Sequence, residues 1–211
     1  MSVLKHTTFN PRWWAINGHV HTVASSFSSV KPVEVERVEI DTPDGDFLEI
    51  DIHDTHNDLP IIALFHGLEG NSERFYIRNL MHDLDAIGLS TIALNFRGCG
   101  SRINAQKRFY HSGETSDVKL LFDWMTESFP NRKIYAVGFS LGANILIKSL
   151  GELKHTHPAH KAVAVSPPYD LRLGCLNLEH GFNKLYNTRF VKALSEKLAE
   201  KRLQFPDLPH F

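Results

Sequence analysis

The strand, turn and helix predicted over residues 133–150 constrain the fold of this chain more than any other part of its sequence. Residues 134–137 (I-Y-A-V) are an apolar run of strand length, typical of a strand buried on both faces of a parallel sheet. From Leu141 the pattern becomes helical, and Gly151 stands where we expect the helix to end. Ser140 therefore lies at the turn between a buried strand and a helix.

This serine lies in the pattern G-x-S-x-G, which residues 138–142 fill as G-F-S-L-G. The glycines leave room for a strained turn that lifts the serine oxygen clear of the sheet, and the following helix points N–H groups toward any oxyanion. The five-residue pattern is weak by itself, but the strand before it and the helix after it strengthen it. We interpret Ser140 as a nucleophile at an elbow; the alternative is an ordinary strand-to-helix turn.

The composition is that of one soluble globular domain, with 42% hydrophobic and 22% charged residues in a chain of 211. A formal net charge of −1 leaves no electrostatic footprint for nucleic acid or an anionic membrane surface, so neither partner is predicted. We find no signal-peptide pattern and no apolar run near the roughly 20 residues of a membrane span. Cys99 and Cys175 occur in unrelated contexts that favour free thiols, so we expect a cytoplasmic protein.

Further strand patterns surround the elbow. Residues 33–53 alternate apolar and polar around T-P-D-G at 42–45, which predicts a β-hairpin. Residues 59–65, 90–95 and 161–166 are apolar runs that we interpret as further buried strands. Together these patterns predict an α/β sheet that begins with a hairpin and continues with alternating strands and helices.

Helical patterns connect and follow these strands. The first, capped by Ser72 and stopped by Gly88, has an apolar face at Leu80, Met81, Leu84 and Ile87. The second, capped by Ser116, has one at Val118, Leu121, Phe122 and Met125. After residue 170 only helices are predicted, with Phe190, Val191, Leu194 and Leu198 opposite a charged face of Lys192, Glu196, Lys197, Glu200 and Lys201. Trp13, Trp14 and Phe27 indicate an N-terminal arm packed on the body.

The loop after the strand predicted at 59–65, H-G-L-E-G at 66–70, is a candidate oxyanion loop. Its backbone N–H groups, with that of Leu68 the best candidate, can pair with the N–H of Leu141 to hold a tetrahedral oxyanion. The alternative is a glycine-rich turn with no chemical role.

Several other reactive side chains have structural interpretations that we favour. No motif activates Cys99, so we expect it to be a small packing residue, and His111 and Glu114 to brace a loop. The pairs and clusters of histidine lack a complete ligand set, so a metal-dependent hydrolase is a weaker alternative and no metal is predicted. These histidines are His19, His21, His155, His157 and His160. Gly98 and Gly100 do not form a phosphate loop, and no cofactor is predicted.

Five segments together resemble the YheT-like esterases of the α/β-hydrolase superfamily. They are N-F-R-G-C-G (95–100), Y-H-S-G-E-T (110–115), G-F-S-L-G-A-N (138–144), S-P-P-Y-D (166–170) and G-F-N-K-L-Y (181–186). The resemblance implies an α/β-hydrolase fold, a mostly parallel sheet with flanking helices, with a core at 1–170 and a helical cap at 171–211 whose apolar face shapes the acyl pocket. It also implies a serine carboxylesterase acting on a small-molecule ester, with Ser140 as nucleophile and the N–H groups of Leu68 and Leu141 as oxyanion donors. Ala143 replaces a glycine usual in the family.

The expected triad partners are missing from this pattern. The order in such enzymes is Ser, Asp, His, on loops after two further strands. Downstream of Ser140 the acids are Asp170 and Asp207, and none of the histidines has the required context; those histidines are His155, His157, His160, His180 and His210. We therefore expect the N-terminal two-thirds of an esterase that lacks the last two strands, as a truncated gene, a fragment or half of a split protein. The alternative is a non-catalytic binding or assembly module that keeps the cleft.

A sheet without its last two strands would end at residues 161–166 with an apolar edge. Such an edge invites pairing with another chain, so we expect self-association.

Overall fold

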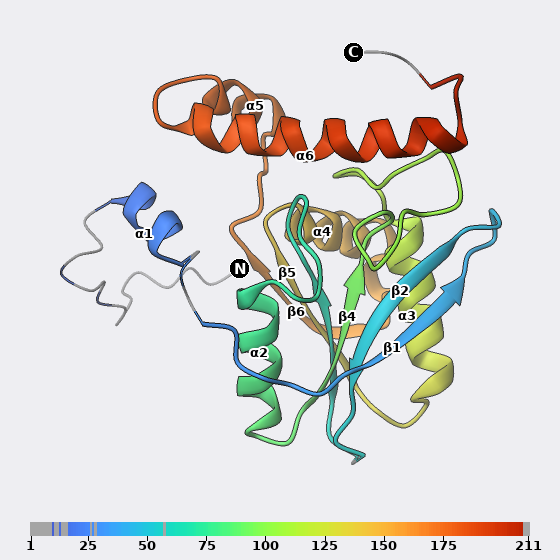
Figure 1. The fold of residues 1–211 in the computed structure, drawn as a ribbon. Coiled ribbons are helices and arrows are strands. Elements are labelled where there is room, and N and C mark those ends of the chain that lie inside the picture. Colours follow the sequence, from blue (N-terminus) through green and yellow to red (C-terminus); the bar gives the residue numbers. More distant parts are fainter. Residues whose placement is uncertain are drawn as a thin grey trace.

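A six-stranded sheet forms the centre of the computed structural model, which describes residues 10, 13, 17–25, 27, 29–56 and 58–208 (Figure 1). Its strand order is β1-β2-β4-β3-β5-β6. The bounds are β1 (Glu36–Asp41), β2 (Phe47–His53), β3 (Ile61–Phe65), β4 (Ser90–Asn95), β5 (Ile134–Phe139) and β6 (Ala159–Val165). β2 is antiparallel to both β1 and β4, whereas β4, β3, β5 and β6 run parallel. The predicted hairpin, the predicted elbow strand and the mixed, mostly parallel sheet are thus confirmed.

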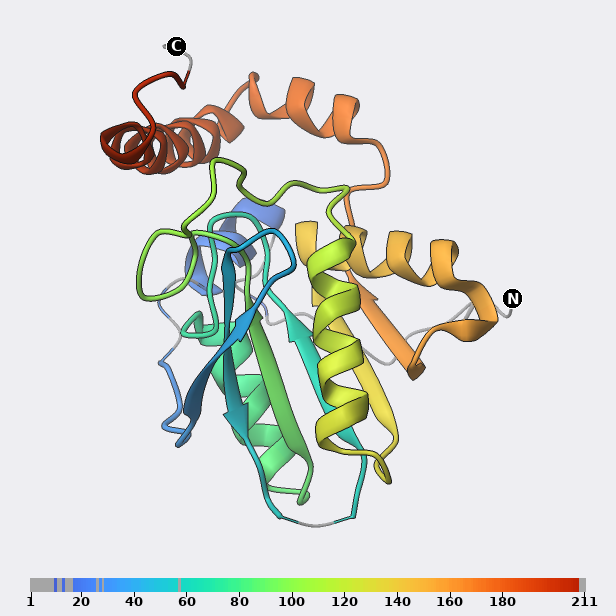
Figure 2. The ribbon, with the colours of Figure 1, turned by 90° about the vertical axis from the view of Figure 1, so that its right-hand side faces the viewer.

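Helices cover both faces of the sheet (Figure 2). Their bounds are α1 (Gly18–Ser25), α2 (Phe75–Asp85), α3 (Ser116–Ser128), α4 (Leu141–Leu153), a 3-10 turn (Lys154–Thr156), α5 (Leu171–Leu178) and α6 (Asn183–Gln204). The side chains of β3 alternate between the two faces: Ile62 and Leu64 pack on α2, while Phe65 packs with α3 and α4. Each fully buried side chain of this size contributes roughly 1.5–3 kcal/mol. The sheet is therefore the middle layer of three.

β6 is not buried as its apolar run predicts, but it is the edge strand expected of a sheet that ends at residues 161–166. It pairs with β5 alone among the described residues, and Val163 is 55% exposed. An apolar strand is buried only where a neighbouring strand or helix covers it. The structure describes no strand on the outer side of β6. β6 is therefore the exposed edge of the described sheet.

Several smaller expectations about helix ends and helix faces were wrong. Ser72 does not cap α2, because its hydroxyl donates to Asp51 at 2.5 Å. Ser116 is the first residue of α3, and its hydroxyl donates to Glu114. Ile87 lies beyond the end of α2 and is exposed, and α4 continues through Gly151 to Leu153.

The N-terminal aromatic residues are not packed on the body as expected. Trp13 and Phe27 are 90% and 83% exposed, and neither belongs to the two buried clusters; Trp14 lies outside the described residues. His19 instead stacks near Tyr186 and Phe182, with ring centroids 6.0 and 4.8 Å away. The side chain of His21 lies outside the described residues.

α5 and α6 lie over the loops at the carboxyl ends of the parallel strands (Figures 1 and 2). The expected apolar inner face of α6 is found only in part: Phe190 and Leu198 are half-buried, but Val191 and Leu194 are exposed. Lys201, expected on the charged outer face, is buried. The ammonium of Lys201 donates to the carbonyl of Asn104, which satisfies it inside the structure. Among the described helices, none is long and apolar enough to cross a membrane.

Candidate active site

Ser140 occupies a strained turn between β5 and α4. Its backbone angles are φ +51° and ψ −118°, a region that costs a non-glycine residue roughly 1–3 kcal/mol. The turn is fixed on both sides: the N–H of Ser140 donates to the carbonyl of Val165 at 2.9 Å, and its own carbonyl accepts from the N–H of Asn144 at 3.0 Å. The residue is exposed at the carboxyl end of the sheet, where a substrate can reach it.

The two glycines of the motif are required by close backbone packing. A Cβ on Gly138 would lie 2.7 Å from the Cα of Ala143, and one on Gly142 would lie 2.6 Å from the carbonyl oxygen of Phe65. Real Cβ atoms essentially never come this close to the backbone. The G-x-S-x-G spacing thus lets helix α4 start directly against β3, which pushes Ser140 outward.

The loop after β3 forms a tight turn beside the serine. The N–H of Gly70 donates to the carbonyl of Gly67 at 3.0 Å, and Glu69 has φ +51°. A positive φ at the third residue alone is the mark of a type II turn. A Cβ on Gly67 would lie 3.2 Å from the Cβ of Ser140, so the turn and the elbow are in contact.

The two predicted oxyanion donors flank the serine on these two segments. Leu68 is the second residue of the turn, and Leu141 is the first residue of α4. Neither N–H donates a hydrogen bond to any residue that the structure describes. Both donors are therefore available to an exogenous acceptor.

His66, which precedes the turn, is a structural histidine. The N–H of Phe96 donates to its Nε2 at 3.1 Å, so Nδ1 carries the proton and donates to the carbonyl of Gly67 at 2.7 Å. Complete burial lowers the pKa of His66 to about 4. The ring is neutral near pH 7 and has no free nitrogen with which to accept the Ser140 proton.

The described acids and histidines downstream of Ser140 have partners other than the serine or are exposed. Asp170 accepts the N–H of Leu173 at 2.8 Å as the N-cap of α5, and Asp207 pairs with Lys107. Nδ1 of His157 accepts the N–H of Ala159 at 3.0 Å. Three further histidines are exposed: His155, His160 and His180. Within the described residues none of these groups is hydrogen-bonded to Ser140, and His210 lies outside them.

The structure brings together no three metal-binding side chains among the residues it describes. Burial raises the pKa of the Cys99 thiol, which keeps it protonated. His111 accepts the N–H of Gly113 through Nδ1, and Glu114 accepts from Arg108 at 2.9 Å, so both brace their loop as expected.

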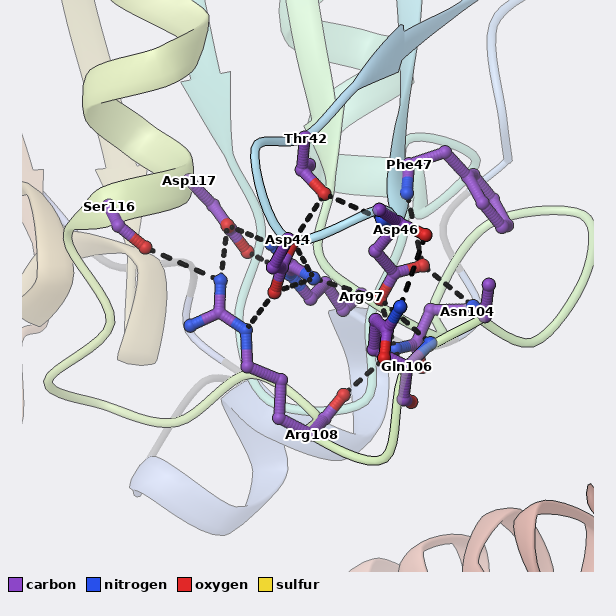
Figure 3. Close-up of polar contacts among 12 residues, drawn as sticks. Thr42, Asp44, Asp46, Phe47, Arg97, Asn104, Gln106, Arg108, Ser116 and Asp117 are labelled. Carbon is purple, nitrogen blue, oxygen red and sulfur yellow. Dashed lines mark hydrogen bonds and ion pairs between the residues drawn. The ribbon is translucent and has the colours of Figure 1, made fainter. Parts of the chain in front are cut away.

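Arg97 is a buried arginine that organises the neighbouring loops (Figure 3). It lies in the N-F-R-G-C-G segment, where the sequence predicted no role for it. Arg97 donates to both oxygens of Asp117 at 2.8 Å, to Asp46 at 2.8 Å and to Asp44 at 3.0 Å. Burial opposes ionisation of Asp46, but hydrogen bonds from Asn104 and from backbone N–H groups still lower its pKa. Arg97 thus ties the hairpin turn and the start of α3 to the loop after β4, and no local signal could pair residues so far apart in sequence.

The sheet order, the antiparallel second strand and the serine elbow define a hydrolase-type α/β fold. The model of the family described as "alpha/beta hydrolase fold" matches residues 60–202. The chain belongs to this family, as its motifs indicated.

Three known proteins place the chain within it. YheT of Escherichia coli (strain K12), described as a candidate esterase, is 32% identical over 170 residues, which are 79% of this chain and 50% of that protein. The monoacylglycerol lipase of Saccharomyces cerevisiae is 34% identical over 53% of this chain and 25% of its own length. The esterase Pf2001 of Pyrococcus furiosus has a TM-score of 0.61 at 28% identity, over 78% of this chain and 62% of that one. The chain spans half or less of these two curated relatives.

Proposed function

We propose that Ser140 of this chain is the nucleophile of a serine ester hydrolase that acts on small carboxylic esters. The observation that carries the proposal is the strained, exposed Ser140 in contact with the turn at 67–70. Relatives named as an esterase and a monoacylglycerol lipase support the same chemistry. In this proposal residues 1–170 are the core, and residues 171–211, with α5 and α6, are a cap over the site.

The proposed reaction uses groups of known position. The Oγ of Ser140 attacks the ester carbonyl carbon, and the N–H groups of Leu68 and Leu141 stabilise the negative charge that develops on the carbonyl oxygen. The alcohol then leaves, and water hydrolyses the acyl-serine. A base has to take the Ser140 proton, and loss of a triad member costs roughly 10⁴- to 10⁶-fold in turnover. Since no such base contacts Ser140 in the described residues, we expect slow reaction from this chain.

Hydrolysis of p-nitrophenyl acetate tests the proposal. We expect weak activity above the buffer rate that is lost in Ser140→Ala. Asp170→Asn serves as the matched control, because that side chain caps α5 and contacts no reacting atom, and its rate should stay within about twofold. Equal rates for wild type and Ser140→Ala would reject Ser140 as the nucleophile.

A binding or assembly module that keeps the cleft is the second candidate. It is favoured by the same observation that slows the reaction, the absence of a base in contact with Ser140 among the described residues. An ester that binds with unchanged affinity to wild type and Ser140→Ala, with no product from either, would support this candidate.

A further inference from the structure

An ion pair joins helix α6 directly to the turn beside Ser140. The ammonium of Lys197 lies 2.9 Å from Oε1 of Glu69, the third residue of that turn. Both side chains are mostly buried, with 14% and 10% of their surface exposed. Such a pair is costly to break from one side, because the remaining charge stays in a poorly hydrated place.

Glu69 is held in its left-handed conformation from several directions. Its N–H donates to the hydroxyl of Tyr110 at 2.7 Å, and its carbonyl accepts from Arg74 at 2.6 Å. The Tyr110 hydroxyl in turn donates to Oε1 of Glu69 at 2.9 Å. Burial raises the pKa of Tyr110, so the hydroxyl keeps its proton and remains a hydrogen-bond donor to Glu69.

These hydrogen-bond partners are needed to hold the strained turn in place. A positive φ at the third turn position suits glycine, and a glutamate there persists only where its surroundings enforce it. Three of the contacts come from the core, and only the Lys197 contact comes from α6. The lysine also caps the cluster, since its ammonium lies 3.2 Å from the Cys99 sulfur and 5.6 Å from the Tyr110 ring centre.

The contact between α6 and the core is unusually polar at this point. Lys197 and Lys201 lie one helical turn apart and face inward, while Val191 and Leu194 are exposed. The helix is thus held over the site by charged groups, and one of them ends on the turn that carries Leu68.

We propose that Lys197 and Glu69 are positioning residues that couple the seating of α6 to the geometry of the oxyanion turn. When α6 is seated, the ion pair fixes Glu69 and therefore the orientation of the Leu68 N–H. When α6 lifts, the carboxylate loses its cation and the turn relaxes. The inference rests on the proposed function for the role of Leu68, but the coupling itself has a readout that needs no activity.

Hydrogen–deuterium exchange of the full chain gives that readout at residues 66–70. We expect Lys197→Met to speed exchange of the hydrogen-bonded turn amides, those of Glu69 and Gly70, by about 10- to 100-fold, the range that a charged hydrogen bond contributes to a local opening equilibrium. Lys197→Arg should restore protection to within about twofold. Lys192→Met is the matched control, because this lysine lies on the same helix, is 74% exposed and pairs only weakly with Glu196 at 3.8 Å. If Lys197→Met does not fold, Glu69→Gln removes the other charge of the same ion pair and keeps a side-chain oxygen that can accept from Tyr110.

The alkylation rates of the two cysteines, measured in the same samples, report whether α6 is seated on the core. Cys99 is buried beside Lys197; burial raises the pKa of its thiol and the lysine lowers it, so loss of the lysine reduces the thiolate fraction and only greater exposure can make Cys99 react faster in Lys197→Met. We expect that acceleration, whereas the exposed Cys175 should react equally in every variant. Unchanged exchange at 66–70 in Lys197→Met or Glu69→Gln would overturn the coupling. Failure of wild-type Ser140 to react with any ester would instead reject the proposed function and leave the exchange result to decide the coupling.

Discussion

The contact between helix α4 and strand β3 predicts opposite effects for two glycine-to-alanine changes in one helix. In Gly142→Ala the new methyl group would lie 2.6 Å from the carbonyl oxygen of Phe65 and closer still to that of His66. An ordinary C···O contact is about 3.3–3.6 Å, so the start of α4 would have to move by about 1 Å. In Gly151→Ala the methyl group meets nothing within 4 Å.

The expected energies follow from these distances. Overpacking costs typically 1–3 kcal/mol, and we expect at least about 3 kcal/mol for Gly142→Ala because both clashing partners are backbone atoms. Gly151→Ala should stabilise the protein by roughly 0.5–1 kcal/mol through helix propensity. Urea unfolding followed by circular dichroism measures both changes. With a slope near 2–3 kcal/mol/M, the Gly142→Ala midpoint should fall by about 1 M or more.

A Gly142→Ala variant as stable as wild type would show that α4 does not start against β3 in the way described, and the account of the elbow would fail with it. If this variant is recovered only as insoluble protein while Gly151→Ala is soluble, the packing argument is supported.

Three further predictions concern pH, the buried arginine and the sheet edge. His66 has a folded pKa of about 4 and an unfolded pKa near 6.5, so the unfolded chain takes up the proton first and stability should fall by about 2 kcal/mol between pH 7 and pH 5. Urea midpoints should show this fall in wild type but much less in His66→Gln, and an equal fall in both would contradict it. Arg97→Met leaves the buried carboxylate of Asp46 without its arginine and Asp117 with Arg108 alone, and should cost about 3–5 kcal/mol in the same assay; a loss below about 1 kcal/mol would refute the role of the arginine. Self-association through β6 predicts a sedimenting mass above the monomer at high concentration that decreases in Val163→Lys, and a monodisperse wild-type monomer would argue against it.

The sequence predicts the centre of this fold well because its signals are local. The apolar run of β5, the two glycines and the helical pattern after Ser140 lie within 20 residues, and each is required by packing that the structure shows. The hairpin is equally local, since β1 and β2 are joined by the turn at 42–45.

The errors occur where a distant residue decides the outcome. Ser72 is a good helix cap by type, but Asp51 of β2 takes its hydroxyl. The lysines of α6 looked like a solvated face, but Glu69 and the carbonyl of Asn104 draw two of them inward. The apolar pattern of β6 alone predicts burial, and its exposure follows only from the expectation that no strand pattern comes after it.

The central claim is that Ser140 is a nucleophile at a preformed elbow, and a fluorophosphonate probe tests it most directly. We predict slow labelling of the wild-type chain, with the adduct mapped by peptide mass spectrometry to Ser140, no adduct in Ser140→Ala, and little change in Asp170→Asn or His210→Ala. Labelling within minutes that stops in His210→Ala would show that this histidine supplies a base, contrary to the account. Labelling of another residue, or none at all under conditions that label an intact serine hydrolase, would contradict the assignment of Ser140.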